Sequence, residues 1–233
     1  MKSFANSLRQ LTFVSLALGA YAQEIPLRIM PLGASITWGY LSSTGNGYRQ
    51  DLLESLNGAG YTVDYVGSQQ SGTMADPDNE GYPGLRIEQV QAKAEENVPT
   101  YLPNVYTINV GTNDAVQNFD VPNAGSRMND LLSYLWSATP EATVILSTLI
   151  INLNATVDAR AQTINTQLTS LASQLAGEGK RIVLADMHGS DGPQSDEMAD
   201  STHPNDVGYQ KMANIWFREI QEASAAGFIQ PAP

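Results

Sequence analysis

Five short runs rich in apolar residues, each the length of a β-strand, alternate with segments of helical periodicity along this chain of 233 residues. The strand-length runs cover residues 27–32, 62–66, 105–110, 143–151 and 181–185. The helical segments cover residues 48–56, 87–96, 124–136, 157–175 and 206–223. Apolar strands separated by helices are typical of a parallel sheet that is covered on both faces. The sequence therefore predicts an α/β protein, a three-layer α/β/α sandwich with a five-stranded parallel sheet.

The first 22 residues have the pattern of a secretory signal peptide. Lys2 and Arg9 lie near the start and precede an apolar run over residues 11–20, and Ala20-Tyr21-Ala22 is a small-x-small cleavage site. We therefore expect the mature chain to be secreted and extracellular. No later stretch is long enough to span a membrane, so stable membrane insertion is not expected. Residues 23–233 show no repeat or linker, which predicts a single domain.

The composition excludes several classes of partner and cofactor. The chain has 24 acidic and 12 basic residues, a formal net charge of −12. Such a charge disfavours binding to nucleic acid and to anionic membranes. The chain has no cysteine, which excludes thiolate metal sites and cysteine redox chemistry. No residue pattern indicates a dimer face, so we expect a monomer that needs no cofactor or metal.

His203, one of two histidines in the chain, follows Asp200 by three residues. Imidazole changes its charge near neutral pH, which suits it to act as a general base toward a hydroxyl nucleophile. An aspartate three residues upstream in a loop could accept the Nδ1 proton of this imidazole and leave Nε2 free. Residues 200–203 are therefore predicted to supply a base and its orienting acid. Because cysteine is absent, the expected nucleophile is a serine.

Ser35 is the candidate for that nucleophile. It follows the first strand through Gly33-Ala34, where a strand-to-helix turn could expose its Oγ and direct its N–H toward an anion. A helix-capping role is the simpler interpretation of its position alone. Loops beyond the carboxyl ends of the strands in an open α/β sheet gather at one edge. We therefore expect Ser35 and residues 200–203 at the same edge, and their proximity would favour catalysis.

Asn113 and a glycine could stabilise a negatively charged oxygen at the same edge. Asn113 follows the third strand, and its side-chain amide could donate a hydrogen bond to a developing oxyanion. Gly81 and Gly84 precede the helix expected over residues 87–96 and could offer a backbone N–H. Taken singly, an Asx turn and a glycine-proline turn explain these positions as well.

Three other polar positions are interpreted as surface features. His188 follows the fifth strand and is expected in a loop or at the surface, with lining of the cleft as an alternative. The acidic run over residues 76–80 could bind calcium, but its spacing differs from the known calcium loop, which favours a solvated loop. Asn154 begins an Asn-x-Thr glycosylation sequon.

Four blocks in order along the chain resemble those of the SGNH hydrolase superfamily, the GDSL-type esterases. The blocks are Gly33-Ala-Ser35-Ile-Thr37, Gly84, Gly111-Thr-Asn113-Asp114 and Asp200-Ser-Thr-His203-Pro204. One block would be weak evidence, but four in the family's order make the resemblance specific. It implies a flavodoxin-like fold over nearly the whole mature chain. Where the superfamily usually has aspartate between glycine and serine, this chain has Ala34.

Within the superfamily, the chain is similar to secreted esterases of carbohydrate esterase family 3, which remove acetyl groups from xylan. This similarity rests on the segments RIMPLG, GYR, DYVG and DNEG, at residues 28–33, 47–49, 64–67 and 78–81. The resemblance implies that Ser35 is the nucleophile, His203 the general base and then acid, and Asp200 its orienting partner. It also implies an oxyanion hole made by the Ser35 N–H, the Gly84 N–H and the Asn113 side chain.

The expected function is therefore hydrolysis of acetyl-type esters on a plant cell-wall polysaccharide such as acetylated xylan, through an acyl-enzyme. Trp38 and Tyr82 are the expected substrate-binding aromatic residues. Two alternatives stay open. One is a lipase or lysophospholipase, which the lack of a long apolar lid segment disfavours. The other is a catalytically silent carbohydrate-binding protein with Trp38, Tyr40 and Tyr82 as sugar-stacking platforms.

Overall fold

The computed structural model describes residues 25–233. The signal peptide expected over residues 1–22 lies outside the described residues and stays a prediction. No helix within the described residues has the length and apolar character needed to cross a membrane.

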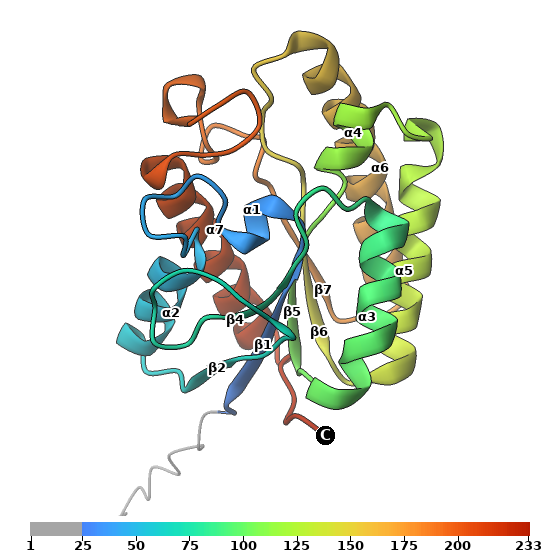
Figure 1. Ribbon diagram of the computed structural model, residues 1–233. Helices are drawn as coiled ribbons and strands as arrows, with labels where there is room; N and C mark the ends of the chain where they lie inside the picture. The colour runs from blue at the N-terminus through green and yellow to red at the C-terminus, as the bar shows by residue number, and fades with distance from the viewer. Residues whose placement is uncertain (1–24) are drawn as a thin grey trace, which may run out of the picture.

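Within residues 25–233, seven strands form one sheet in the middle of the molecule (Figure 1). They are β1 (Leu27–Gly33), β2 (Val63–Tyr65), β3 (Gln69–Gln70), β4 (Asp78–Gly81), β5 (Val105–Asn109), β6 (Thr143–Ser147) and β7 (Ile182–Ala185). The order is β3-β4-β1-β5-β6-β7, and β2 pairs with β1 beside its first residues. The polar segments that follow β1, β5 and β7 therefore leave the sheet at one edge.

The α/β class and the five predicted strands are confirmed, but the predicted number of strands is wrong. The predicted strands correspond to β1, β2, β5, β6 and β7, and the pairings that join them are parallel. Two more strands extend the sheet, with β4 parallel to the last residues of β1 and β3 antiparallel to β4. Because β3 and β4 are short and polar, they lack the apolar pattern that reveals the other strands.

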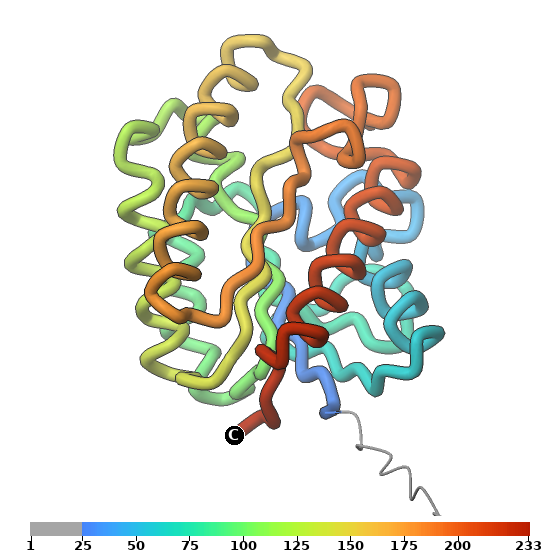
Figure 2. Tube along the Cα trace, turned by 180° about the vertical axis from the view of Figure 1, so that it is seen from behind, coloured from blue at the N-terminus to red at the C-terminus, as the bar shows by residue number. Residues whose placement is uncertain are grey.

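Helices cover both faces of this sheet (Figures 1 and 2). Those of the described chain are α1 (Ser35–Trp38), α2 (Arg49–Gly58), α3 (Ile87–Tyr101), α4 (Thr112–Gln117), α5 (Ala124–Ala138), α6 (Ala155–Gly177) and α7 (Asp206–Ala225). On one face α2 packs against α7, while on the other face α5 packs against α3 and α6. The five helical segments expected from the sequence are all helices, so the three-layer architecture is confirmed.

Successive side chains of β1 supply both apolar layers because they point to opposite faces of the sheet. Leu27 and Ile29 pack in the cluster beneath α2 and α7, and Met30 and Leu32 pack in the cluster beneath α3, α5 and α6. All four side chains are fully buried. Burying each contributes roughly 1.5–3 kcal/mol of hydrophobic stabilisation. The strand that leads to Ser35 is therefore anchored on both faces.

A buried arginine ties together the loops that surround α1. The guanidinium of Arg49 donates to the carbonyl oxygens of Trp38 (3.3 Å), Ser71 (2.9 Å) and Pro77 (2.8 Å). The side chain is fully buried. Because a buried charge without partners costs several kcal/mol, these carbonyl contacts offset the loss of hydration. Arg49 thus joins the end of α1 to residues 71–77.

Candidate active site

Ser35 lies on a tight turn between β1 and α1. A Cβ on Gly33 would lie 2.3 Å from the carbonyl oxygen of Asn109 and 2.3 Å from Thr37 Oγ1, so the close packing at this turn requires glycine. The helix ends after one turn at Gly39, whose φ of 91° is in the left-handed region. The Ser35 carbonyl accepts hydrogen bonds from the N–H groups of Gly39 (3.1 Å) and Tyr40 (3.0 Å). The backbone of Ser35 is therefore held on both sides while its side chain stays partly exposed.

The structure brings Ser35, His203 and Asp200 into one chain of contacts. His203 Nε2 lies 2.9 Å from Ser35 Oγ, and His203 Nδ1 lies 2.9 Å from Asp200 Oδ2 and 3.1 Å from Oδ1. With its proton on Nδ1, the imidazole donates to the carboxylate and presents Nε2 as an acceptor for the Ser35 hydroxyl. This is the order of contacts that a serine needs to lose its proton during nucleophilic attack.

The Asp200 carboxylate also shapes the loop that carries His203. Its Oδ1 accepts hydrogen bonds from the N–H groups of Thr202 (2.7 Å) and His203 (2.7 Å). Burial alone would raise the pKa of Asp200, but the hydrogen bonds from the His203 imidazole and from these two N–H groups outweigh it and hold the pKa below its ordinary value. Asp200 therefore stays ionised at neutral pH beside the imidazole.

Asn205 fixes the other end of this loop by capping α7. Its side-chain oxygen accepts from the N–H groups of Val207 (3.0 Å) and Gly208 (3.1 Å), two of the N–H groups that a helix leaves unpaired at its start. Pro204 is buried between the cap and His203. The imidazole is thus attached to a backbone that the start of a 20-residue helix holds in place.

The two other candidates for the oxyanion hole lie on segments that contact each other, one in α4 and one in the loop before α3. Asn113 belongs to α4, and one hydrogen of its amide is donated to the Leu85 carbonyl oxygen at 2.9 Å. Its second amide hydrogen can serve a ligand. Gly84 is exposed with a φ of 86°, a conformation that glycine adopts without strain. Sequence reasoning could not foresee that Asn113 and the Gly84 loop are joined by a hydrogen bond.

Tyr40 is the aromatic residue that contacts the candidate catalytic histidine. Its ring centroid lies 4.8 Å from that of His203, with the planes inclined by 61°. The Tyr40 side chain is 48% exposed, and its carbonyl oxygen accepts from the Tyr209 hydroxyl at 2.7 Å. An exposed ring on a fixed backbone beside the imidazole is suited to contact a bound substrate.

Trp38 and Tyr82, the aromatic residues expected to bind substrate, have contacts of other kinds. The Trp38 carbonyl accepts from the Ser71 hydroxyl at 2.6 Å. The Tyr82 hydroxyl donates to Glu80 Oε2 at 2.6 Å, and burial together with this bond raises the pKa of Tyr82. Within residues 25–233, no hydrogen bond or ring contact joins either side chain to Ser35 or His203. Their role in substrate binding stays a prediction.

His188 has an acidic partner that sequence spacing did not reveal. Its Nε2 lies 3.2 Å from Asp158 Oδ1 in α6, 30 residues earlier in the chain. Asp158 Oδ1 also accepts from the Asn152 N–H at 2.9 Å, and the Asn152 amide donates to Thr202 Oγ1 at 3.1 Å. His188 is therefore a partly buried loop residue that is linked through α6 to the back of the catalytic loop.

The acidic run over residues 76–80 is not the solvated loop that its spacing favoured. Asn79 and Glu80 are fully buried in β4. Glu80 accepts from the Ser68 N–H and the Tyr82 hydroxyl, and Asn79 Oδ1 accepts from the Gly81 N–H at 2.9 Å. Within residues 25–233, no group of three His, Asp or Glu side chains is placed to hold a metal ion.

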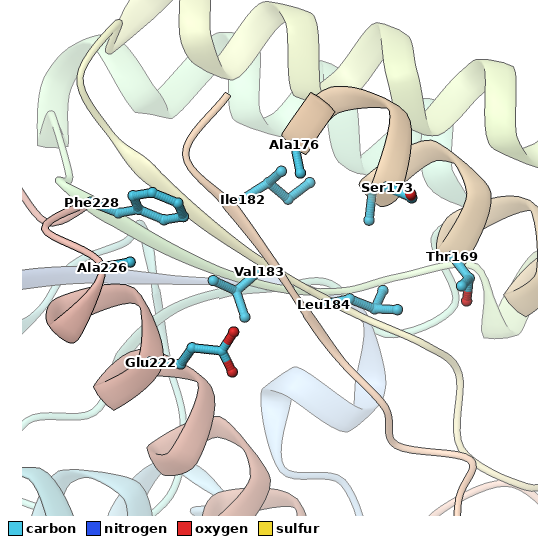
Figure 3. A pocket seen from close by; sticks show the side chains of 10 residues that line it. Thr169, Ser173, Ala176, Ile182, Val183, Leu184, Glu222, Ala226 and Phe228 are labelled. Atoms are coloured by element: carbon cyan, nitrogen blue, oxygen red, sulfur yellow. The ribbon is translucent and has the colours of Figure 1, made fainter. Parts of the chain in front are cut away.

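A recess of about 440 Å³ lies along β7 between α6 and α7 (Figure 3). Ser35, Asp200 and His203 are not among the residues that line it. Apolar and small side chains line most of it, including Ile182, Leu184 and Phe228. Glu222 is the one ionisable residue in its lining, so neither the Thr169 nor the Ser173 hydroxyl has a histidine beside it in the recess.

A mostly parallel sheet between two helical layers, with a serine after its first strand in contact with a histidine before its last helix, defines the SGNH hydrolase class. The model of the GDSL-like lipase/acylhydrolase family matches residues 29–216. The chain belongs to this family of carboxylic ester hydrolases, and the resemblance stated from the four sequence blocks is confirmed.

Individual relatives are carbohydrate esterases and a multidomain esterase. A family 3 carbohydrate esterase from Clostridium thermocellum is 26% identical with a TM-score of 0.77, covering 86% of this chain and 98% of that one. A family 3 carbohydrate esterase from Talaromyces cellulolyticus is 25% identical with a TM-score of 0.74, covering 85% and 99%. A multidomain esterase from Ruminococcus flavefaciens is 28% identical over 94% of this chain, which spans 32% of that relative.

Proposed function

We propose that this chain is an extracellular serine esterase that removes acetyl groups from a plant cell-wall polysaccharide such as acetylated xylan. The observation that carries the proposal is the chain of contacts from Ser35 Oγ to His203 and from His203 to Asp200, both at 2.9 Å. The family 3 carbohydrate esterases among its structural relatives support an acylated carbohydrate as substrate. The secretory pattern of residues 1–22 supports an extracellular location.

The proposed reaction has two steps. Ser35 Oγ attacks the acetyl carbonyl carbon while its proton passes to His203 Nε2, and the resulting oxyanion accepts hydrogen bonds from the Ser35 N–H, the Gly84 N–H and Asn113. Collapse of this intermediate breaks the bond to the sugar oxygen, which leaves with the proton from His203 Nε2 as a sugar hydroxyl, and acetyl-Ser35 remains. Water then gives a proton to His203 Nε2 and attacks the acyl carbon. Collapse of this second intermediate breaks the bond to Ser35 Oγ, which takes the proton back from His203, and releases acetic acid.

Asp200 keeps the imidazole useful in both steps. Its carboxylate holds the Nδ1 proton, so Nε2 faces Ser35, and its negative charge stabilises the imidazolium that forms during attack. Because its pKa is held below the ordinary value, it supplies this charge throughout the neutral range.

Replacing Ser35 by Ala tests the chemistry. The variant should fold as the wild type does and lose hydrolysis of p-nitrophenyl acetate by at least about 10³-fold, because the nucleophile is gone. Acetate release from acetylated xylan, measured beside acetylated chitin, pectin and mannan, then tests the substrate. Retained turnover in a pure S35A preparation would refute the serine mechanism, whereas faster release from another polymer would refute only the xylan assignment.

The two alternatives give different results in the same assays. A lipase would prefer palmitoyl over acetyl esters across a chain-length series. A silent carbohydrate-binding protein would bind xylan without releasing acetate, and S35A would then change nothing. The exposed Tyr40 ring beside His203 suits sugar binding in an active esterase as well as in a silent binding protein, so it does not favour the silent alternative.

A further inference from the structure

Asp114 follows the candidate oxyanion residue Asn113 in α4 and is fully buried. Its Oδ2 accepts a hydrogen bond from the Ile87 N–H at 3.2 Å, and its Oδ1 accepts from the guanidinium of Arg127 in α5. Ile87 begins α3, so this carboxylate occupies one of the N–H groups that the helix leaves unpaired. The buried Asp114 carboxylate thus connects the first turns of α3 and α4 to α5.

Arg127 has further partners that fix its place. It donates to the carbonyl oxygens of Phe119 (3.2 Å) and Asp120 (3.0 Å) and forms an ion pair with Glu88 (2.9 Å). Its side chain is 14% exposed. A planar guanidinium with this many partners holds one orientation, because each hydrogen bond limits its rotation. Asp114 is therefore paired with a rigid cation.

Three more hydrogen bonds join the same two segments nearer to the candidate oxyanion hole. Asn113 donates to the Leu85 carbonyl at 2.9 Å, and Gln117 donates to the Gly84 carbonyl at 3.2 Å. Arg86 donates in turn to Gln117 Oε1 at 2.7 Å. The two bonds of Gln117 are exposed and that of Asn113 is partly buried, whereas the bond from Ile87 to Asp114 is buried.

We propose that Asp114 and Arg127 are positioning residues that set the spacing between the Gly84 N–H and the Asn113 amide. The two donors come from separate segments of the chain, and an oxyanion hole works only when its donors are fixed before the charge develops. The inference rests on the proposed oxyanion role of Gly84 and Asn113. Neither Asp114 nor Arg127 needs to touch the substrate in this arrangement.

The decisive variant is Asp114→Asn, which keeps an oxygen for the Ile87 N–H and removes the charge that pairs with Arg127. We expect kcat for p-nitrophenyl acetate to fall about 10- to 100-fold while KM changes little. Misplaced donors reduce the stabilisation of the transition state more than they reduce the binding of the substrate. Asp191→Asn, which removes the charge of an exposed carboxylate paired with Arg218, is the matched control and should leave kcat within a factor of about 2.

A double-mutant cycle separates positioning from general destabilisation. Once Asn113→Ala has removed one of the two donors whose spacing is at issue, adding Asp114→Asn should lower kcat less than about 3-fold, because that spacing no longer affects the reaction. Arg127→Lys is the second variant, which keeps the charge but loses the forked contacts, and should also lower kcat with KM unchanged. Thermal unfolding of each variant is measured beside its kinetics.

Equal losses from Asp114→Asn in the wild-type and Asn113→Ala backgrounds would overturn the proposal, as would a rise in KM with kcat unchanged. If Asp114→Asn does not fold, a normal kcat in Arg127→Lys would overturn it. An error in the proposed function itself is recognised by a different result, because the Ser35→Ala variant would then retain activity.

Discussion

His203 Nε2 lies 2.9 Å from Ser35 Oγ, although 168 residues separate them along the chain. The parallel sheet accounts for this, since β1 and the segments after β7 leave it at the same edge. Each side chain is attached to a backbone with local restraints: Ser35 at the start of α1, and His203 between the Asp200 hydrogen bonds and the capped start of α7. Both groups are therefore placed before a substrate arrives.

Asp200→Asn should lower kcat by about 10²- to 10⁴-fold, because an amide cannot hold the imidazole in the orientation and tautomer that leave Nε2 free. Asparagine retains an oxygen for the N–H groups of Thr202 and His203, so the loop should keep its shape. Asp200→Ala removes those backbone contacts as well and should unfold at lower temperature. Steady-state kinetics and thermal unfolding compare the two; a kcat for Asp200→Asn within about 3-fold of wild type would contradict the orienting role.

The stability of the protein should depend on pH through Asp200. A carboxyl group whose pKa is lowered by folding stabilises the folded state above its unfolded pKa, about 3.9, and loses that contribution as the pH falls through the folded value. Asp200→Asn should therefore lower the free energy of unfolding more at about pH 6 than at about pH 3, where part of the contribution is lost. Urea unfolding at the two pH values measures this difference. An equal loss at both would show that the charge of Asp200 does not stabilise the fold.

The local pattern of the sequence predicts most of the fold. The segment over residues 206–223 has helical periodicity, and the structure has α7 at Asp206–Ala225 with Asn205 as its cap. Periodicity reports which face of an element is buried, and that signal is strong where the apolar residues are many. It is absent in β3 and β4, whose sequences are Gln69–Gln70 and Asp78–Gly81. Those strands depend on pairing with β1 and with each other.

The sequence also places Ser35, Asn113 and residues 200–203 at one edge, because each follows a strand of a parallel sheet. It cannot predict how side chains on separate helices meet. The pair of Asp114 with Arg127 joins α4 to α5, and the pair of His188 with Asp158 joins a loop to α6. These contacts depend on how the helices pack, which no spacing within one segment reports. The buried position of Arg49 likewise depends on loops that meet only in the folded chain.

Asn113→Ala should lower kcat by about 10²- to 10³-fold with little change in KM, because the amide is proposed to bind the oxyanion only as negative charge develops. The variant also loses the bond to the Leu85 carbonyl, so its unfolding temperature is measured as well. Asn57→Ala removes an exposed asparagine side chain from α2 and serves as the matched control, with unchanged kinetics expected. A rise in KM with an unaltered kcat would assign Asn113 to substrate binding instead.

Tyr40 should distinguish a polysaccharide substrate from a small ester. Its ring is 48% exposed beside His203, so a bound sugar could cover it, whereas p-nitrophenyl acetate needs little more than the acyl site. Tyr40→Ala should lower kcat/KM on acetylated xylan oligosaccharides by about 10-fold, equivalent to ~1.4 kcal/mol, and by less on p-nitrophenyl acetate. Tyr40→Phe keeps the ring and is the matched control, with both values near wild type. If Tyr40→Ala lowers kcat/KM equally on the two substrates, the ring acts by restraining the His203 imidazole and makes no contact with the sugar.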